Sequence, residues 1–318
     1  MKTETPCDLC NQNTFDRIAD CDRNNRPLDT VICTNCGLVR HATVPSDSDL
    51  ARFYSGSYRQ EYNGEKTPGP RRVMRAWLNG ERICRQISSA IPAGGKVLEI
   101  GAGIGCTVKV FEQAGFRAEG IDPGGEFLTY SRERLQARVN TCSLDDLPAT
   151  PQFDAVLLVH VIEHLRSPLK SLRHIARLLK PSGLLYIECP NLQAPFASRR
   201  RLFHYAHIHN FVPATLQQCG AGSGFGLHGR FGDDQDPNLQ MLFRKTSGVI
   251  LKTDPMNAQR TLQDLRRTDF LPYHLRSRYI IDRVRKVSSY AQEHLHARAF
   301  VERLVDHCSE SQIRSRAA

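Results

Sequence analysis

The feature that most constrains the fold lies between residues 96 and 245, where short apolar runs alternate with segments of helical periodicity. Such alternation is typical of a parallel sheet covered by helices on both faces. It predicts strands at 96–100, 117–121, 138–141, 155–159 and 184–188, and helices at 107–114, 125–136, 168–179 and 213–219. A final hairpin is expected to pair 224–231 with 239–244. The expected fold is therefore α/β, a Rossmann-like doubly wound sheet of seven strands with the last antiparallel.

The segments on either side of this region differ from it in character. Residues 1–44 contain two Cys-x-x-Cys pairs and little helical periodicity, and residues 45–95 form a connector with a helix predicted at 71–89. Residues 246–318 place Leu, Ile and Val at helical spacing. We expect this C-terminal extension to be helical, and to cover the preceding domain or form a homodimer contact; a basic face towards an anionic membrane is the alternative.

The two Cys-x-x-Cys pairs predict a zinc site. A two-residue gap lets both thiolates of a pair bind one ion, and two pairs complete a tetrahedral shell. Twenty-two residues lie between the two pairs. Gly37 follows the second pair, where a tight turn is expected. Cys21 and His41 are alternatives, but four thiolates already fill a structural site, which leaves no open position for water. We therefore expect residues 1–44 to be a zinc ribbon with a folding role. Its expected ligands are Cys7, Cys10, Cys33 and Cys36.

A glycine-rich turn follows the first predicted strand and indicates a nucleotide site. The strand at 96–100 runs into Gly101-Ala102-Gly103-Ile104-Gly105, where glycines permit a tight turn and close approach to a ligand. Asp122 lies 21 residues after Gly101, at the end of the second strand, where a carboxylate can accept both ribose hydroxyls. The NAD fingerprint would need glycine at 106, but this chain has Cys106.

The pattern G-x-G-x-G, with Glu99 two residues before it, resembles motif I of class I S-adenosylmethionine-dependent methyltransferases. The resemblance extends over residues 96–245. It includes Phe153-Asp154-Ala155-Val156, then His160-Val161-Ile162-Glu163-His164-Leu165, and the turn Leu179-Lys180-Pro181-Ser182-Gly183. His207 to Leu216 resemble a segment of a bacterial small-molecule and sugar-type subgroup. A zinc knuckle before such a domain is similar to sugar C-methyltransferases of deoxysugar pathways, whose further large C-terminal domain does not fit in the 73 residues after Lys245.

The resemblance implies a set of residues around S-adenosylmethionine. Gly101, Ala102, Gly103 and Gly105 would line its methionine and ribose part with Glu99, and Asp122 would hold the ribose hydroxyls. Pro123, Leu144 and Asp145 would frame the adenine, and His160 would lie beside the methionine end. Tyr58, in the connector 45–95, would close over the cofactor; a packing role is its alternative. The cofactor-binding candidates are Tyr58, Glu99, Gly101, Ala102, Gly103, Gly105, Asp122, Pro123, Leu144, Asp145 and His160.

The residues after the fourth strand are the candidates for catalysis. Methyl transfer from a sulfonium is an in-line displacement, so the protein must chiefly hold donor and acceptor in line. A hydroxyl acceptor must lose its proton, and histidine is suited to accept it at neutral pH. His160 and His164 share one face of a helical turn. We therefore predict His164 as general base, Glu163 as the residue that orients a ring or the cofactor, and His209 as an acceptor contact.

Charge and composition narrow the class of partner. The net charge is +10, yet residues 1–70 carry 8 basic and 10 acidic side chains, and the surplus elsewhere is spread out. A small-molecule acceptor, most plausibly a sugar or surface-glycan precursor, is therefore favoured over an RNA gripped by the ribbon, because RNA binding requires cations. A non-catalytic binding protein of the same fold is the third alternative. No apolar run approaches the roughly 20 residues that span a membrane, and no signal peptide is recognisable, so we expect a cytoplasmic protein.

Overall fold

The computed structural model describes residue 3 and residues 5–56, 67–124, 126–246, 253–277 and 279–317. The chain divides into two compact units. The first comprises residues 1–51, 149–151 and 158–279, and the second comprises residues 52–148, 152–157 and 280–318.

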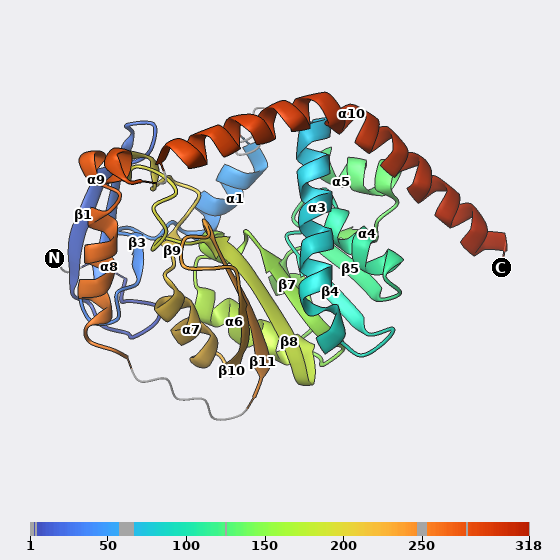
Figure 1. Ribbon diagram of the computed structural model, residues 1–318. Coiled ribbons are helices and arrows are strands. Elements are labelled where there is room, and N and C mark those ends of the chain that lie inside the picture. The colour runs from blue at the N-terminus through green and yellow to red at the C-terminus, as the bar shows by residue number, and fades with distance from the viewer. Residues whose placement is uncertain are drawn as a thin grey trace. The chain divides into compact units, whose positions relative to one another are not determined.

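A seven-stranded sheet is the central element of the α/β fold (Figure 1). Its strand order is β10-β11-β8-β7-β4-β5-β6, and β4, β5 and β6 are parallel. The last strand of the chain, β11, is antiparallel to both of its neighbours, β10 and β8. The prediction of a Rossmann-like sheet with an antiparallel last strand is therefore confirmed. The strands are β4 Lys96–Ile100, β5 Arg117–Asp122, β6 Val139–Thr141, β7 Phe153–Val159, β8 Leu179–Pro190, β10 Phe225–Phe231 and β11 Asn238–Lys245.

The helices that alternate with these strands begin and end close to their predicted positions, with one exception. The helix expected at 125–136 is α5 Glu126–Tyr130 followed by a π-helical turn, η2 Ser131–Leu135, which ends at Gln136 with a φ of 54°. Ser131 is fully buried, so this turn is tightly packed. The other helices are α3 Pro70–Ile87, α4 Cys106–Gln113, α6 Pro168–Leu178 and α7 Pro213–Ala221, with short 3-10 turns at η1 Ser88–Ala90, η3 Leu144–Asp146, η4 Ile162–His164 and η5 Arg199–Arg201.

The first unit contains a second, four-stranded sheet that the sequence pattern did not predict. Its order is β1-β2-β3-β9, with β1 Phe15–Cys21, β2 Pro27–Cys33 and β3 Val39–His41 from the cysteine-rich segment. The fourth strand, β9 His209–Asn210, comes from much later in the chain and pairs antiparallel with β3. Ile32 and Val39 of this sheet share a buried cluster with Phe203, Val212 and residues of α8, so part of the core of the cysteine-rich segment is formed with residues from later in the chain.

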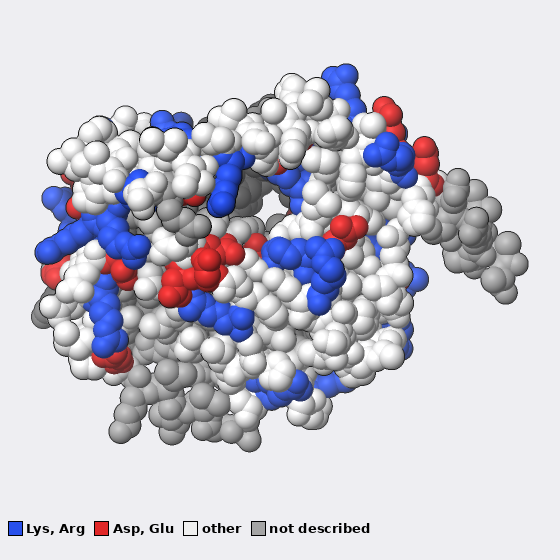
Figure 2. All heavy atoms as spheres, in the orientation of Figure 1, with Lys and Arg blue, Asp and Glu red and all other residues white. Residues whose placement is uncertain are grey.

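The C-terminal segment is helical where it is described. It contains α8 Asn257–Arg266, α9 Phe270–Leu275 and the long α10 Tyr279–Ala317; α1 Asp47–Gly56 lies earlier in the chain. In the second unit, the Arg75 side chain of α3 forms an ion pair with Glu293 of α10 and lies 5.1 Å from the Tyr290 ring centroid. No helix among the described residues is long and apolar enough to cross a membrane. On the face drawn in Figure 2, basic and acidic side chains are interspersed in small groups.

Candidate functional site

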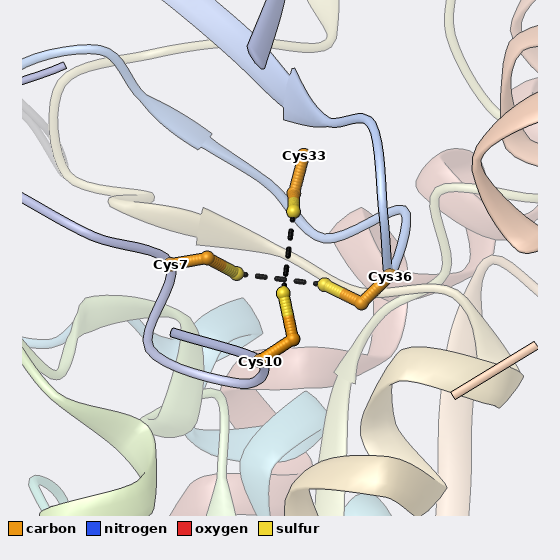
Figure 3. A group of neighbouring side chains, drawn as sticks. All are labelled: Cys7, Cys10, Cys33 and Cys36. Carbon is orange, nitrogen blue, oxygen red and sulfur yellow. Dashed lines mark hydrogen bonds between the residues drawn. The ribbon is translucent and has the colours of Figure 1, made fainter. Parts of the chain in front are cut away.

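Four cysteine side chains converge at one point of the first unit (Figure 3). The Sγ atoms of Cys7 and Cys36 are 3.4 Å apart and those of Cys10 and Cys33 are 3.5 Å apart. All four sulfur atoms lie within 4.8 Å of one another. Four thiolates at about 2.3 Å from one zinc ion would be about 3.8 Å apart, so this arrangement fits a tetrahedral site. The structure thus brings together all four cysteines that the sequence predicted as ligands.

Neighbouring elements hold both halves of this cysteine group in place. The Asn257 side chain of α8 donates a hydrogen bond of 2.6 Å to the Cys36 carbonyl. Asp8, between the first two cysteines, accepts hydrogen bonds from the Ser167 hydroxyl and from the Leu169 amide at the start of α6. A hydrogen bond from Cys33 is the largest of the effects that lower the pKa of Cys10. Hydrogen bonding with Cys10 in turn raises the pKa values of Cys7 and Cys36.

In the second unit, the turn after β4 has a backbone conformation that favours glycine. Gly101, Gly103 and Gly105 have φ angles of 75°, 48° and 79°, a region that L-residues rarely adopt. A Cβ atom at Gly103 would meet nothing nearer than 3.9 Å, so its backbone faces open space. A Cβ atom at Gly105 would lie 2.2 Å from the Ser131 hydroxyl. Gly103 is thus open to a ligand, whereas Gly105 is required by packing and conformation.

Two carboxylates, both buried, border the turn. Asp122, at the end of β5, accepts hydrogen bonds of 3.1 Å from the amides of Gly103 and Gly124. Glu99 in β4 has a buried oxygen, Oε2, without a hydrogen-bond partner among the described residues. Burial raises the pKa of Glu99 to about 8, although hydrogen bonds from the Thr107 side chain and the Val108 amide oppose this shift. The structure places both carboxylates at the turn, as the sequence predicted.

The remaining predicted cofactor residues lie near the ends of successive strands. Ala102 and Leu144 are buried, whereas Pro123 and Asp145 are exposed. Leu144 and Asp145 lie in η3, whose start is fixed by the capping hydrogen bonds between Ser143 and Asp146. Tyr58 lies outside the described residues.

A group of histidines surrounds Glu163 in the first unit, directly after β7. His160 has a φ of 55°, a strained conformation that is often found at functional sites. Its Nδ1 atom is 3.4 Å from Glu163 Oε1, and its Nε2 atom is 3.9 Å from Glu188 Oε1. Its side chain is 44% exposed, whereas those of Glu163 and Glu188 are nearly inaccessible. His160 is thus the most exposed histidine of this group.

His164 and His207 approach the same carboxylate from other directions. Their Nε2 atoms are 4.0 Å and 3.9 Å from Glu163 Oε1. The Nδ1 atom of His164 donates to the Ala206 carbonyl at 2.7 Å. Burial lowers the pKa of His207 well below its usual value, so this imidazole is neutral at pH 7. His207 and Glu188 were not predicted as site residues; a high density of histidine between 160 and 209 was the only sequence signal.

His209 lies apart from the exposed edge of this group. Its side chain is 1% exposed, and its Nδ1 atom lies 3.1 Å from the Leu165 carbonyl. Burial, with the nearby charge of Arg40, lowers the pKa of His209 to about 3. This placement, in β9 against β3, favours a role in positioning the His164 segment over direct contact with an acceptor.

Comparison with known proteins gives the class of the domain. Residues 74–228 match a family model described as "Methyltransferase domain". A solved 1,6-didemethyltoxoflavin-N1-methyltransferase from Burkholderia thailandensis superposes with a TM-score of 0.51 at 19% identity, covering 66% of this chain and 96% of that one. The fold is that of class I, Rossmann-like methyltransferases. The family model matches residues 74–228, just under half of the chain.

The curated relatives each match less than half of this chain. A ubiquinone biosynthesis O-methyltransferase from Xanthomonas oryzae pv. oryzae (strain PXO99A) is 32% identical over 152 residues, which are 46% of this chain and 63% of that protein. A tRNA U34 carboxymethyltransferase from Hydrogenovibrio crunogenus is 33% identical over 164 residues, which are 44% of this chain and 48% of that protein. The chain therefore spans less than two thirds of the length of these relatives.

Proposed function

We propose that this protein transfers a methyl group from S-adenosylmethionine to a hydroxyl group of a small molecule, most plausibly a sugar or surface-glycan precursor. The observation that carries the proposal is the turn after β4, where Gly103 is open and its amide is held by the Asp122 carboxylate. A relative named as an O-methyltransferase supports an oxygen acceptor.

The residues of the second unit suit the cofactor. Positive φ angles at Gly101 and Gly103 let the backbone approach a ligand without a side chain in the way. Asp122 has the carboxylate needed to accept two ribose hydroxyls, and Leu144 offers an apolar side chain for the adenine. When bound, S-adenosylmethionine supplies an activated methyl group with a neutral thioether leaving group. No metal or redox step is required for that transfer.

The reaction forms a carbon–oxygen bond and breaks a carbon–sulfur bond, and the hydroxyl proton passes to a base. We assign the base to a histidine beside Glu163, which would stabilise the resulting imidazolium. The sequence assigned this role to His164, whose Nδ1 donates to the Ala206 carbonyl, so that Nε2 is the nitrogen that would accept the proton. The geometry also favours His160, because its side chain is 44% exposed and that of His164 only 16%.

Single-turnover methyl transfer tests this assignment with His160→Ala, His164→Ala and, as a control, the exposed His228→Ala. Acceptors are drawn from a panel of nucleotide sugars and phenols. Loss of the base should lower the rate by roughly 10²–10⁴-fold while cofactor affinity is unchanged. Rates within a few-fold of wild type for both variants would refute the assignment to this group.

The four-cysteine group is proposed to hold one structural zinc ion. Cys7, Cys10, Cys33 and Cys36 would be its ligands, and the closed shell leaves no position for a substrate.

A second candidate function, RNA methylation, is suggested by the tRNA-modifying relative. It is disfavoured because Arg40, one of the few cations of the ribbon, is buried over the Phe15 ring. A gel shift with RNA at low and high salt, run beside the acceptor panel, separates the two.

A further inference from the structure

Glu163 is an unusual side chain in the core of the first unit. It is 1% exposed, and neither of its carboxylate oxygens has a hydrogen-bond partner among the described residues. A buried carboxylate without hydrogen bonds costs several kcal/mol unless a counter-charge compensates it. Something of positive charge is therefore expected at Glu163.

Two of the three imidazoles that face Glu163 are placed as ligands rather than as hydrogen-bond donors. Nε2 of His164 and Nε2 of His207 lie 4.0 Å and 3.9 Å from Oε1, beyond hydrogen-bond range. The three donor atoms lie within 4.8 Å of one another. Ligand bonds of about 2.1 Å in a tetrahedral shell bring neighbouring donors to about 3.4 Å, so each of the two Glu163–histidine distances must contract by about 0.5 Å in such a site.

The hydrogen bond of His164 fixes which nitrogen faces the carboxylate. Because a carbonyl can only accept, the 2.7 Å contact with Ala206 places the proton on Nδ1. In the neutral ring, Nε2 then presents a lone pair towards Glu163. A second-shell carbonyl that orients an imidazole in this way is the usual arrangement around a metal-binding histidine.

We propose that Glu163, His164 and His207 bind a divalent transition-metal ion of the zinc type, distinct from the ion assigned to the four cysteines. Two imidazoles and one carboxylate favour zinc and its neighbours over magnesium or calcium. Three protein ligands leave an open coordination position, which is typical of sites that act on a substrate. His160, whose Nδ1 lies 3.4 Å from Oε1, remains outside the set and is exposed to solvent.

The role of the ion rests on the proposed function. An acceptor hydroxyl bound at the open position would lose its proton more easily, because a metal ion lowers the pKa of bound hydroxyl groups. His164 would then be a ligand, and His160 would take the proton. The binding of the ion itself does not depend on methyl transfer.

Zinc binding by the full chain tests the proposal directly. The protein is equilibrated with excess Zn²⁺, passed through a desalting column and analysed for metal, and Zn²⁺ is titrated calorimetrically into protein that carries only the first ion. Glu163→Gln and His207→Gln are compared with His228→Gln, a control at an exposed position of β10. Thermal melting and S-adenosylhomocysteine binding report whether each variant is folded.

We expect two zinc ions per wild-type and His228→Gln chain, and one in the Glu163→Gln and His207→Gln variants. In these two variants the affinity of the second site for Zn²⁺ should fall more than about 100-fold. Loss of a residue that only hydrogen-bonds a metal ligand lowers metal affinity by at most about 100-fold. A hundredfold excess of Mg²⁺ should not compete. One zinc in the wild type, an unchanged second site in folded Glu163→Gln, or displacement by Mg²⁺ would each overturn the proposal, whether or not methyl transfer is observed.

Discussion

The buried Glu99 makes the stability of the cofactor-free protein depend on pH in a defined direction. Its pKa is raised to about 8 in the folded state by burial, whereas an unfolded chain has a glutamate pKa of about 4.3. Between these values the folded state keeps a proton that the unfolded state releases. Stability contributed by the protonated carboxyl is therefore present at low pH and is lost as pH rises through this window.

The magnitude follows from linkage. A full difference of one bound proton changes the free energy of unfolding by about 1.4 kcal/mol per pH unit. Glu99→Gln removes the titrating group while keeping its shape. As pH rises from 5.5 to 7.5, the free energy of unfolding of this variant should increase by about 3 kcal/mol relative to that of the wild type. Across that interval the folded wild type binds almost one more proton than its unfolded state, and the variant has no such difference at position 99.

Urea unfolding at half-unit pH steps measures this difference. The exposed Glu133→Gln in η2 is the matched control, and its difference from wild type should stay flat. The reasoning is refuted if the free-energy difference between Glu99→Gln and wild type is constant from pH 5.5 to 7.5. That constant difference would show that Glu99 is ionised in the folded state across these pH values.

Two further predictions concern packing and metal. Gly105→Ala should lower the free energy of unfolding by about 2–5 kcal/mol, because a left-handed φ and a contact of 2.2 Å with Ser131 both oppose a Cβ atom. Gly115→Ala, with a φ of 87° but open space, should cost only about 1–2 kcal/mol, and equal urea midpoints for the two would contradict this. Cys33→Ser should lose one zinc ion by metal analysis and melt at lower temperature; unchanged zinc content would exclude the four-cysteine site.

Much of the seven-stranded sheet could be predicted because β4, β7 and β8 contain buried apolar runs. The predicted strand at 96–100 coincides with β4, and the hairpin predicted at 224–231 and 239–244 is β10 and β11. The strand predicted at 184–188 is shorter than β8, which begins at Leu179 and passes through Ser182 at a φ of 59°. The turn residues Pro181, Ser182 and Gly183 led the prediction to begin the strand at residue 184, where pairing with β11 also begins.

The four-stranded sheet could not be predicted, for a different reason. β1 is interrupted by register shifts between Arg17 and Ala19 and between Ala19 and Cys21, so its side chains do not alternate with a period of two. β9 has only two residues and exists because β3 pairs with it. Sequence periodicity reports neither feature, since both depend on contacts between distant segments.

The candidate site residues also divide into those that local sequence predicts and those that depend on contacts between distant segments. Cysteine spacing predicted all four proposed zinc ligands, because the Cys-x-x-Cys turn is a local structure. The approach of His207 to Glu163 depends on a loop 44 residues away in the chain, and burial of His209 depends on β3. Histidine type and density could indicate such a group, but they could not say which rings share the carboxylate.

The measurement that tests the central claim most directly is calorimetric titration of S-adenosylmethionine into the full chain. We predict micromolar binding to the wild type and to the exposed-site control Asp306→Ala, and no binding of NAD. Asp122→Ala should weaken binding more than about tenfold, because hydrogen bonds to a charged group contribute about 1.5–3 kcal/mol. Binding of NAD in place of S-adenosylmethionine, or equal affinity in folded Asp122→Ala, would contradict the assignment.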